Sequence, residues 1–324
     1  MKIQIKPFLM KYIFYILMPL ILIGCQESEN ESIKLYKDKQ YERAFPLLKA
    51  DAEKGQAQAQ FYFGQLHEEG NIVKIDEQEA LTWYQKAAEQ NNSDAQFSLG
   101  EAYFYGKFGL KQDLQKAFDF YKKSAESGNV SSQIKLGLCY YFGRGTKINY
   151  KKSIEWLKKG LAEDKNKDKS AYFLLGKMYF KGLGTLRDPS ESAVWFEKAA
   201  VLGDANAQAM LASQYYDGQG ILTNNERAKY WAEKSAEQGN EGGEFFLGMI
   251  HEFRGDTEQD KKEAVTWYKK ASEKGMYVAS FRLAKLYEEG KGVNKDLKKG
   301  LDYYKLAEKQ GGKEAVEKLR NLTQ

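Results

Sequence analysis

Ser132 and Lys135 are the pair of residues in this chain whose spacing most directly suggests catalysis. In a Ser-x-x-Lys sequence, a serine hydroxyl can attack an acyl group while a nearby lysine takes part in proton transfer. The sequences Ser-Asp-Asn and Lys-Thr-Gly, which accompany it in enzymes of this kind, are absent. A serine and a lysine three residues apart are also common on helix surfaces, so this pair alone does not predict a hydrolase.

The two histidines, His67 and His251, are the next candidates for chemistry because histidine titrates near neutral pH. They occupy the same position of a repeat described below, five repeats apart. At about 10 Å for each packed helix layer they are expected roughly 50 Å apart, which is too far for a shared site. Each is interpreted as a packing residue. The chain has no metal-ligand spacing, phosphate loop or Gly-x-Ser-x-Gly sequence, so we expect no metal and no cofactor.

The composition excludes two further classes of function. The formal net charge is +5, and lysine and glutamate alternate along the chain without a basic patch, so no nucleic-acid partner is expected. The hydrophobic fraction of 42% is enough for a core, which argues against a disordered chain. The 29 glycines, against 4 prolines, need an explanation in a chain that otherwise reads as helix.

The N-terminus has the pattern of a secretory signal. Three lysines precede an apolar run, residues 12–24, which is too short for the roughly 20 residues of a transmembrane helix. The sequence Leu22-Ile23-Gly24-Cys25 resembles a bacterial lipobox, which implies lipidation of Cys25. An ordinary signal peptide with an incidental Cys25 is the alternative. Cys139 would then be the remaining thiol, and its apolar surroundings predict an inert, buried side chain.

A repeat of about 36 residues organises the rest of the chain. Each repeat has a small residue after a large apolar one, and successive small residues are 36 to 39 positions apart. These anchor residues are Gly64, Gly100, Gly137, Gly176, Ala212, Gly248 and Ala284. A charged insertion, residues 163–169, accounts for the longest spacing and is interpreted as a solvated bulge or a partner-specific loop.

Each repeat is expected to contain two antiparallel helices, helix A and helix B. Helix A carries the anchor residue and, three positions later, a tyrosine or histidine; a glycine turn follows it. Helix B is expected to begin at an Asp or Asn N-cap, to carry a large ring seven residues later, and to end at a left-handed glycine. The expected N-caps are Asp76, Asp113, Asn149, Asp188, Asn224, Asp260 and Asp296.

This pattern resembles the Sel1-like repeat family, a relative of the tetratricopeptide repeats. The segments Ala171–Tyr179 and Asp260–Tyr268 show it well. The resemblance implies an all-α fold, an α-solenoid of antiparallel helix pairs forming a right-handed superhelix. One repeat cannot bury its apolar faces alone, so neighbouring repeats stack and bury them. The expected organisation is a signal peptide (1–24), a lipidated cysteine with a short tether (25–31), an N-terminal half-repeat cap (32–55), seven repeats (56–312) and a C-terminal capping helix (313–324).

A partner-binding groove is the leading hypothesis for function. One position after the tyrosine of helix A, aromatic residues in four successive repeats are flanked at both ends by glutamates; the aromatic residues are Phe104, Tyr141, Phe180 and Tyr216. Exposed rings are enriched at binding hot spots. Packing of these rings on the adjacent helical turn is the alternative.

The sequence therefore favours a non-enzymatic scaffold or adaptor that binds a protein or peptide partner in the cell envelope. The lipobox implies an outer-membrane lipoprotein facing the periplasm or the cell surface, because Gln26 stands where inner-membrane retention would require Asp. Resemblance to the family suggests export or envelope-stress regulation as settings. The alternatives are an immunity protein that occludes a secreted toxin and a β-lactamase-like hydrolase built on Ser132 and Lys135.

Overall fold

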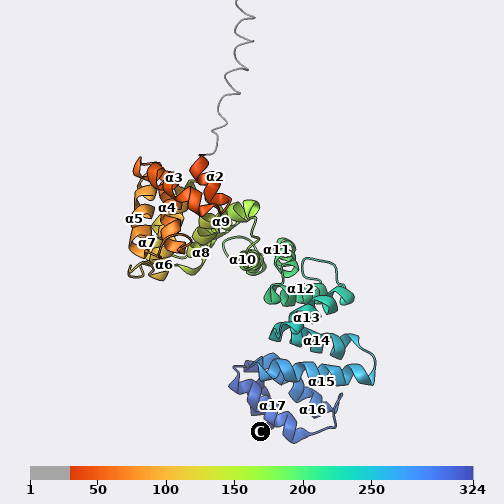
Figure 1. Ribbon diagram of the computed structural model, residues 1–324. Helices are drawn as coiled ribbons and strands as arrows, with labels where there is room; N and C mark the ends of the chain where they lie inside the picture. Colours follow the sequence, from red (N-terminus) through yellow and green to blue (C-terminus); the bar gives the residue numbers. More distant parts are fainter. Residues whose placement is uncertain (1–29, 324) are drawn as a thin grey trace, which may run out of the picture. The chain divides into compact units, whose positions relative to one another are not determined.

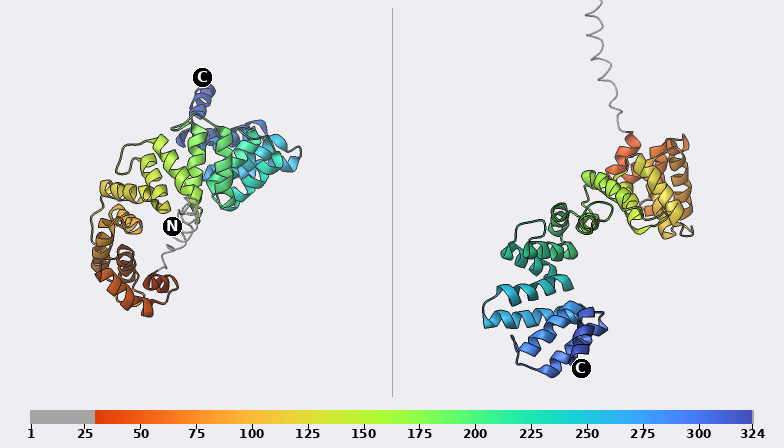
Figure 2. Two further views of the ribbon diagram at one scale, coloured as in Figure 1. Left: turned by 90° about the horizontal axis from the view of Figure 1, so that it is seen from above. Right: turned by 180° about the vertical axis from the view of Figure 1, so that it is seen from behind.

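The computed structural model describes residues 30–323, and within this range it contains seventeen α-helices and no strand. The all-α repeat fold predicted from the sequence is confirmed. The helices form two compact units, divided between Ser127 and Gly128. In each unit consecutive helices pack against one another in chain order (Figures 1 and 2).

Between residues 30 and 127 the first unit contains six helices. Two of them precede the first complete helix pair and bury Leu48 and Ala52 against α4. The helices are α2 (Glu31–Lys37), α3 (Tyr41–Glu53), α4 (Ala57–Glu69), α5 (Glu77–Glu89), α6 (Ser93–Tyr105) and α7 (Leu114–Glu126).

The second unit continues the alternation of helix A and helix B and ends with one extra helix. That last helix, α18, buries Ala315 completely. The helices are α8 (Val130–Phe142), α9 (Tyr150–Glu163), α10 (Lys169–Lys181), α11 (Pro189–Val201), α12 (Ala205–Asp217), α13 (Asn225–Glu237), α14 (Glu241–Arg254), α15 (Glu258–Glu273), α16 (Tyr277–Glu289), α17 (Leu297–Lys309) and α18 (Lys313–Thr323).

Helix B begins at the predicted N-cap in six repeats. The side chain of each cap accepts a hydrogen bond from a backbone N–H in the first helical turn, which would otherwise lack a partner. These caps are Asp76, Asp113, Asn149, Asp188, Asn224 and Asp296.

The prediction of Asp260 as an N-cap is wrong. Helix α15 begins one turn earlier, with Thr257 as the cap and Asp260 inside the first turn. The two residues form a capping box, in which the Thr257 hydroxyl accepts from the Asp260 N–H and the Asp260 carboxylate accepts from the Thr257 N–H. The capping box therefore gives the N–H groups of both Thr257 and Asp260 a partner.

Glycine at the anchor position lets helix A and helix B of one repeat approach closely. A large, fully buried side chain of helix B lies directly over it. A Cβ built on Gly176 would lie 2.5 Å from the Phe196 ring, and one on Gly248 would lie 2.5 Å from the Tyr268 ring. The other such pairs are Gly64 with Tyr84, Gly100 with Tyr121 and Gly137 with Leu157.

The second glycine of the turn after helix A joins neighbouring repeats. Gly184, Gly220 and Gly292 have positive φ, and a Cβ at each would lie 2.2 to 2.5 Å from backbone atoms in the first turn of the preceding helix B. The contacted residues are Tyr150 and Lys151, Pro189 and Ser190, and Lys261 respectively. These three turn glycines therefore satisfy two requirements at once, a left-handed backbone and close backbone packing.

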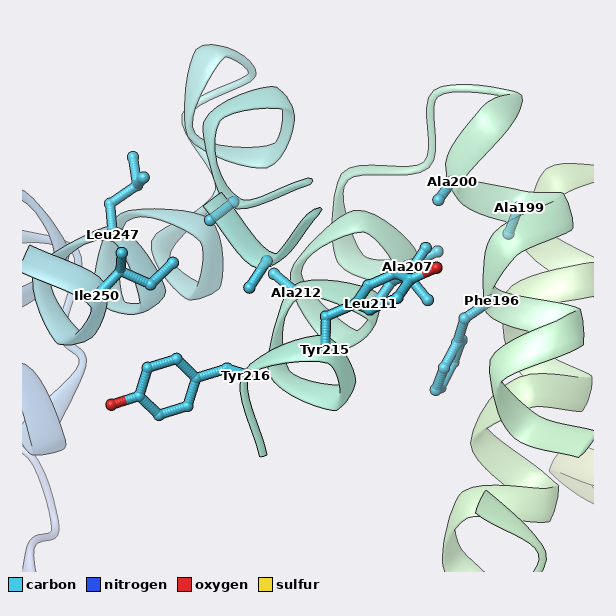
Figure 3. Packing of buried hydrophobic residues seen from close by; sticks show 12 residues of the cluster. Phe196, Ala199, Ala200, Ala207, Leu211, Ala212, Tyr215, Tyr216, Leu247 and Ile250 are labelled. Atoms are coloured by element: carbon cyan, nitrogen blue, oxygen red, sulfur yellow. The ribbon is translucent and has the colours of Figure 1, made fainter. Parts of the chain in front are cut away.

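Figure 3 shows how one hydrophobic cluster of the second unit links three repeats. Phe196 of α11 faces Leu211 of α12. The Tyr216 ring extends from α12 toward α14, where Leu247 and Ile250 lie. Alanines at the helix contacts, such as Ala207 and Ala212, are fully buried.

Candidate functional site

Ser132 is not placed for catalysis. It lies in the first turn of α8, its exposed fraction is 0%, and its N–H donates to the side chain of the N-cap residue Asn129. Lys135 is half-buried on the same helix. A serine nucleophile must be reachable by its substrate, so this burial argues against the hydrolase reading.

The two histidines make different contacts, although they share a repeat position. His67 in α4 packs edge-on against Phe63, with ring centroids 4.9 Å apart, and neither of its ring nitrogens has a hydrogen-bond partner. His251 in α14 lies 2.9 Å from an Asp260 carboxylate oxygen through Nδ1. In residues 30–323 no group of three or more His, Cys, Asp or Glu side chains could hold a metal ion.

The contacts of Asp260 predict a pH dependence of stability. Hydrogen bonds from Thr257 and His251 lower the pKa of Asp260 to about 2, below its ordinary value of 3.8. Because the folded-state pKa is depressed, the stabilisation is present above about pH 4 and is lost as the pH falls toward 2. The urea midpoints of the wild type and Asp260→Asn should therefore converge between pH 4 and pH 2. A difference that stays constant over this interval would refute the assignment.

The ring proposed for the groove in the first unit is Phe104, and it is half-buried at the end of α6. It packs on the buried Tyr121 of α7, with centroids 6.3 Å apart. It also meets the next ring, Tyr105, edge-on at 4.8 Å. Phe104 therefore fits both predictions. One part of its ring packs on Tyr121, and another part remains accessible to a partner.

In the second unit the three proposed groove rings differ in exposure. Tyr141 is half-buried against Tyr150, with centroids 5.4 Å apart, and burial is the main cause that raises its pKa. Phe180 is half-buried beneath the Arg187 guanidinium, at 5.5 Å. Tyr216 is 9% exposed and has the Arg254 guanidinium 5.0 Å above it. Phe180 and Tyr216 contact the same hydrophobic cluster, whereas Tyr141 contacts the neighbouring one.

More exposed rings lie one position later, and they are not among the predicted groove residues. Tyr105 is 56% exposed and Phe142 is 50% exposed, and each meets the preceding groove ring edge-on at 4.8 Å. The signal was a run of three aromatic residues at the end of helix A, residues 103–105 and 140–142. Successive helical residues are about 100° apart, so three neighbours cannot all face the core.

The glutamates that flank the proposed groove are tied to the repeat interior. They accept hydrogen bonds at 2.5 to 2.8 Å from buried tyrosines of helix B, sixteen residues later: Glu68 from Tyr84, Glu252 from Tyr268 and Glu288 from Tyr304. Burial and the carboxylate raise the pKa of Tyr84 and of Tyr268. These carboxylates therefore link helix A to helix B within a repeat, in addition to any contact that they could make with a partner.

The predicted lipidation site, Cys25, lies outside the described residues. Cys139 is buried at 3% exposure, as expected from its apolar neighbours. None of the helices between residues 30 and 323 has the length and apolar character needed to span a bilayer.

The model of one protein family, described as Sel1 repeat, matches seven segments of the chain. They are residues 57–92, 93–129, 130–164, 169–204, 205–240, 243–276 and 278–312. No curated protein is similar enough to count as a relative.

Two solved structures are similar to this chain in both sequence and fold. The protective antigen c5321 of uropathogenic Escherichia coli is 31% identical with a TM-score of 0.63; the match covers 84% of this chain and 57% of that protein. A Sel1 repeat protein from Oxalobacter formigenes is 32% identical with a TM-score of 0.60, covering 75% and 98% respectively. The immunity protein Pa5087 of Pseudomonas aeruginosa is 20% identical over 68% of this chain and 83% of that one, and its TM-score of 0.37 carries no functional argument.

Proposed function

Because the chain belongs to the Sel1 repeat family, we propose that it is a scaffold or adaptor that binds a protein partner in the cell envelope. Sel1 repeats generally mediate contacts between proteins, and the fold typically serves as a non-catalytic scaffold. The burial of Ser132 further supports a binding role over the hydrolase alternative.

The observation that carries the proposal is the pairing of half-buried with exposed rings at the end of helix A. In the first unit the pair is Phe104 with Tyr105, and in the second it is Tyr141 with Phe142. The half-buried member of each pair packs against the exposed member and restricts it, so little conformational entropy is lost when a partner covers the exposed ring. Large rings supply much of the contact energy at protein interfaces. Phe180 adds a third half-buried ring in the second unit.

Removing the exposed rings should abolish partner binding without unfolding the protein. We expect the double variant Tyr105→Ala with Phe142→Ala to lose at least tenfold in partner recovery after crosslinking in cells and mass spectrometry. Leu222→Ala is the matched control, because Leu222 is 90% exposed on a loop and outside the ring pairs. Circular dichroism should show equal melting temperatures for all forms. Full recovery by the double variant would eliminate both rings, one in each unit, as binding residues.

A lipid anchor on Cys25 is the second element of the proposal. The supporting observation is the resemblance of residues 22–25 to a lipobox, after an apolar run that is shorter than a membrane span. An acyl chain at this position would place the repeats at the periplasmic face of the outer membrane or at the cell surface.

The anchor is tested by metabolic labelling with radioactive palmitate. The wild type should incorporate label and fractionate with outer membranes, and Cys25→Ser should do neither. Cys139→Ser is the control, since a buried thiol of the repeats should not affect labelling. Label that persists in Cys25→Ser would exclude acylation at Cys25.

A further inference from the structure

A row of polar side-chain pairs connects helix A with helix B inside single repeats. In each pair a buried residue in the first half of helix A contacts a residue thirty positions later, at the end of helix B. The pairs are Gln60 with Gln90 at 2.8 Å, Gln208 with Gln238 at 2.8 Å, Glu244 with Lys274 at 2.6 Å and Ser280 with Gln310 at 2.6 Å. Such pairs satisfy polar groups that would otherwise be buried without a partner.

In the fourth repeat Tyr172 and Leu202 occupy the two positions. Gln60 and Gln208 each donate to a backbone carbonyl eight residues earlier, whereas the Tyr172 hydroxyl is 3.5 Å from the Leu161 carbonyl, eleven residues earlier. The difference of three residues equals the excess in the spacing of this repeat, 39 against 36 positions, for which the charged insertion accounts. The insertion thus coincides with the replacement of a polar pair by an apolar one.

A cavity of about 330 Å³ lies at this replaced pair. Its lining consists of Lys167, Tyr172, Glu197, Lys198, Val201 and Leu202. Tyr172 is held in place by Trp195, on which it stacks with centroids 5.9 Å apart. Val201 is 70% exposed, so the apolar wall of the cavity reaches the surface.

Two ammonium groups and one carboxylate, those of Lys167, Lys198 and Glu197, line the cavity, which leaves an excess of one positive charge. Within the described residues Lys167 and Lys198 form no ion pair, and Lys198 lies over the Trp195 ring at 4.1 Å. Two carboxylates of the adjacent insertion accept hydrogen bonds from backbone N–H groups. Asp164 accepts from Asn166 and Asp168, and Asp168 accepts from Ser170 and Ala171. A partner that fits this surface combines an apolar group with negative charge.

We propose that the cavity lined by Tyr172, Val201 and Leu202 binds a large apolar side chain of an acidic peptide segment in a protein partner. The volume is at the lower end of ligand pockets and suits one anchor side chain of a peptide. Lys167 and Lys198 pair with carboxylates on either side of the anchor. This site is separate from the ring pairs of the proposed function, and it is tested independently of them.

The test uses a fluorescein-labelled peptide with the sequence Asp-Glu-Phe-Glu-Asp and a control peptide with alanine in place of phenylalanine. Anisotropy should show at least tenfold tighter binding of the phenylalanine peptide, weakened several-fold by raising salt because the charges are exposed. Amide NMR shifts should locate the bound peptide at α10 and α11. The protein variant Tyr172→Gln with Leu202→Gln, which installs the pair found as Gln208 and Gln238, should lose at least tenfold in affinity.

Further variants separate a binding effect from a folding effect. Val201→Glu alters an exposed side chain and should also reduce binding at least tenfold, with an unchanged melting temperature. Tyr105→Ala with Phe142→Ala should bind the peptide normally, even if it loses the partner of the ring pairs. Equal affinity for the two peptides, or full binding by the double glutamine variant, would overturn the proposal. A dimer in sedimentation that the double glutamine variant dissociates would also overturn it, because the occupant would then be a second copy of the chain.

Discussion

Replacing Gly220 with alanine should destabilise the second unit by about 2–5 kcal/mol, combining backbone strain with overpacking. The new Cβ would lie 2.2 Å from the Pro189 carbonyl carbon and 2.5 Å from the Ser190 nitrogen. Both atoms belong to the backbone of α11, so neither can move aside by changing a rotamer. The helix pair on one side of the contact must shift, which should lower the urea midpoint markedly.

Gly203 is a closely matched control for this variant. Both glycines have φ of 80°, but a Cβ on Gly203 would meet nothing within 4 Å. Gly203→Ala therefore isolates the strain of a left-handed alanine, about 1–2 kcal/mol. Equal losses for the two variants would show that the backbone contact between repeats contributes nothing. Hydrogen exchange should locate the additional loss for Gly220→Ala in α11 and α12.

The contact between Gly176 and Phe196 should show strong non-additivity. Phe196 is fully buried, so Phe196→Ala should cost about 3–5 kcal/mol. Gly176→Ala places a Cβ 2.5 Å from the Phe196 ring and should cost about 1–3 kcal/mol. In the double variant the new methyl group occupies space vacated by the ring, so its loss should be smaller than the sum.

The fifth repeat is a natural precedent for the double variant. It has alanine at both equivalent positions, Ala212 and Ala232, and both are fully buried. A double-mutant cycle by urea unfolding measures the coupling between Gly176 and Phe196. A coupling energy near zero would show that close packing against the Phe196 ring does not require glycine at position 176.

The predictable part of this fold is the part that depends on local chemistry. Asp76 or Asn149 before a helical pattern predicts a cap, because the side chain acts on backbone atoms only two or three residues away. Asp260 is a wrong prediction for the same reason. Its spacing matched the repeat, but Thr257 three residues earlier offered a reciprocal cap that repeat periodicity does not reveal.

The candidate site was only partly predictable, because exposure depends on several helices at once. The sequence placed Phe104 and Tyr216 at one repeat position, yet Phe104 is half-buried while Tyr216 is 9% exposed. The difference lies in what each ring contacts: Arg254 covers Tyr216 from the following repeat. The glutamine pairs could not be predicted from the sequence, because a contact between two side chains thirty residues apart does not appear as a hydrophobic period.

The turn glycines also bear on how the chain folds. Gly220 touches Pro189 and Gly292 touches Lys261, so these contacts join segments separated by roughly one repeat. Chains whose contacts are short in sequence have low contact order and fold quickly, since no long loop must close before a contact forms. Folding of such a chain can start at any adjacent helices and spread to their neighbours. Its rate should therefore depend little on how many repeats the chain contains.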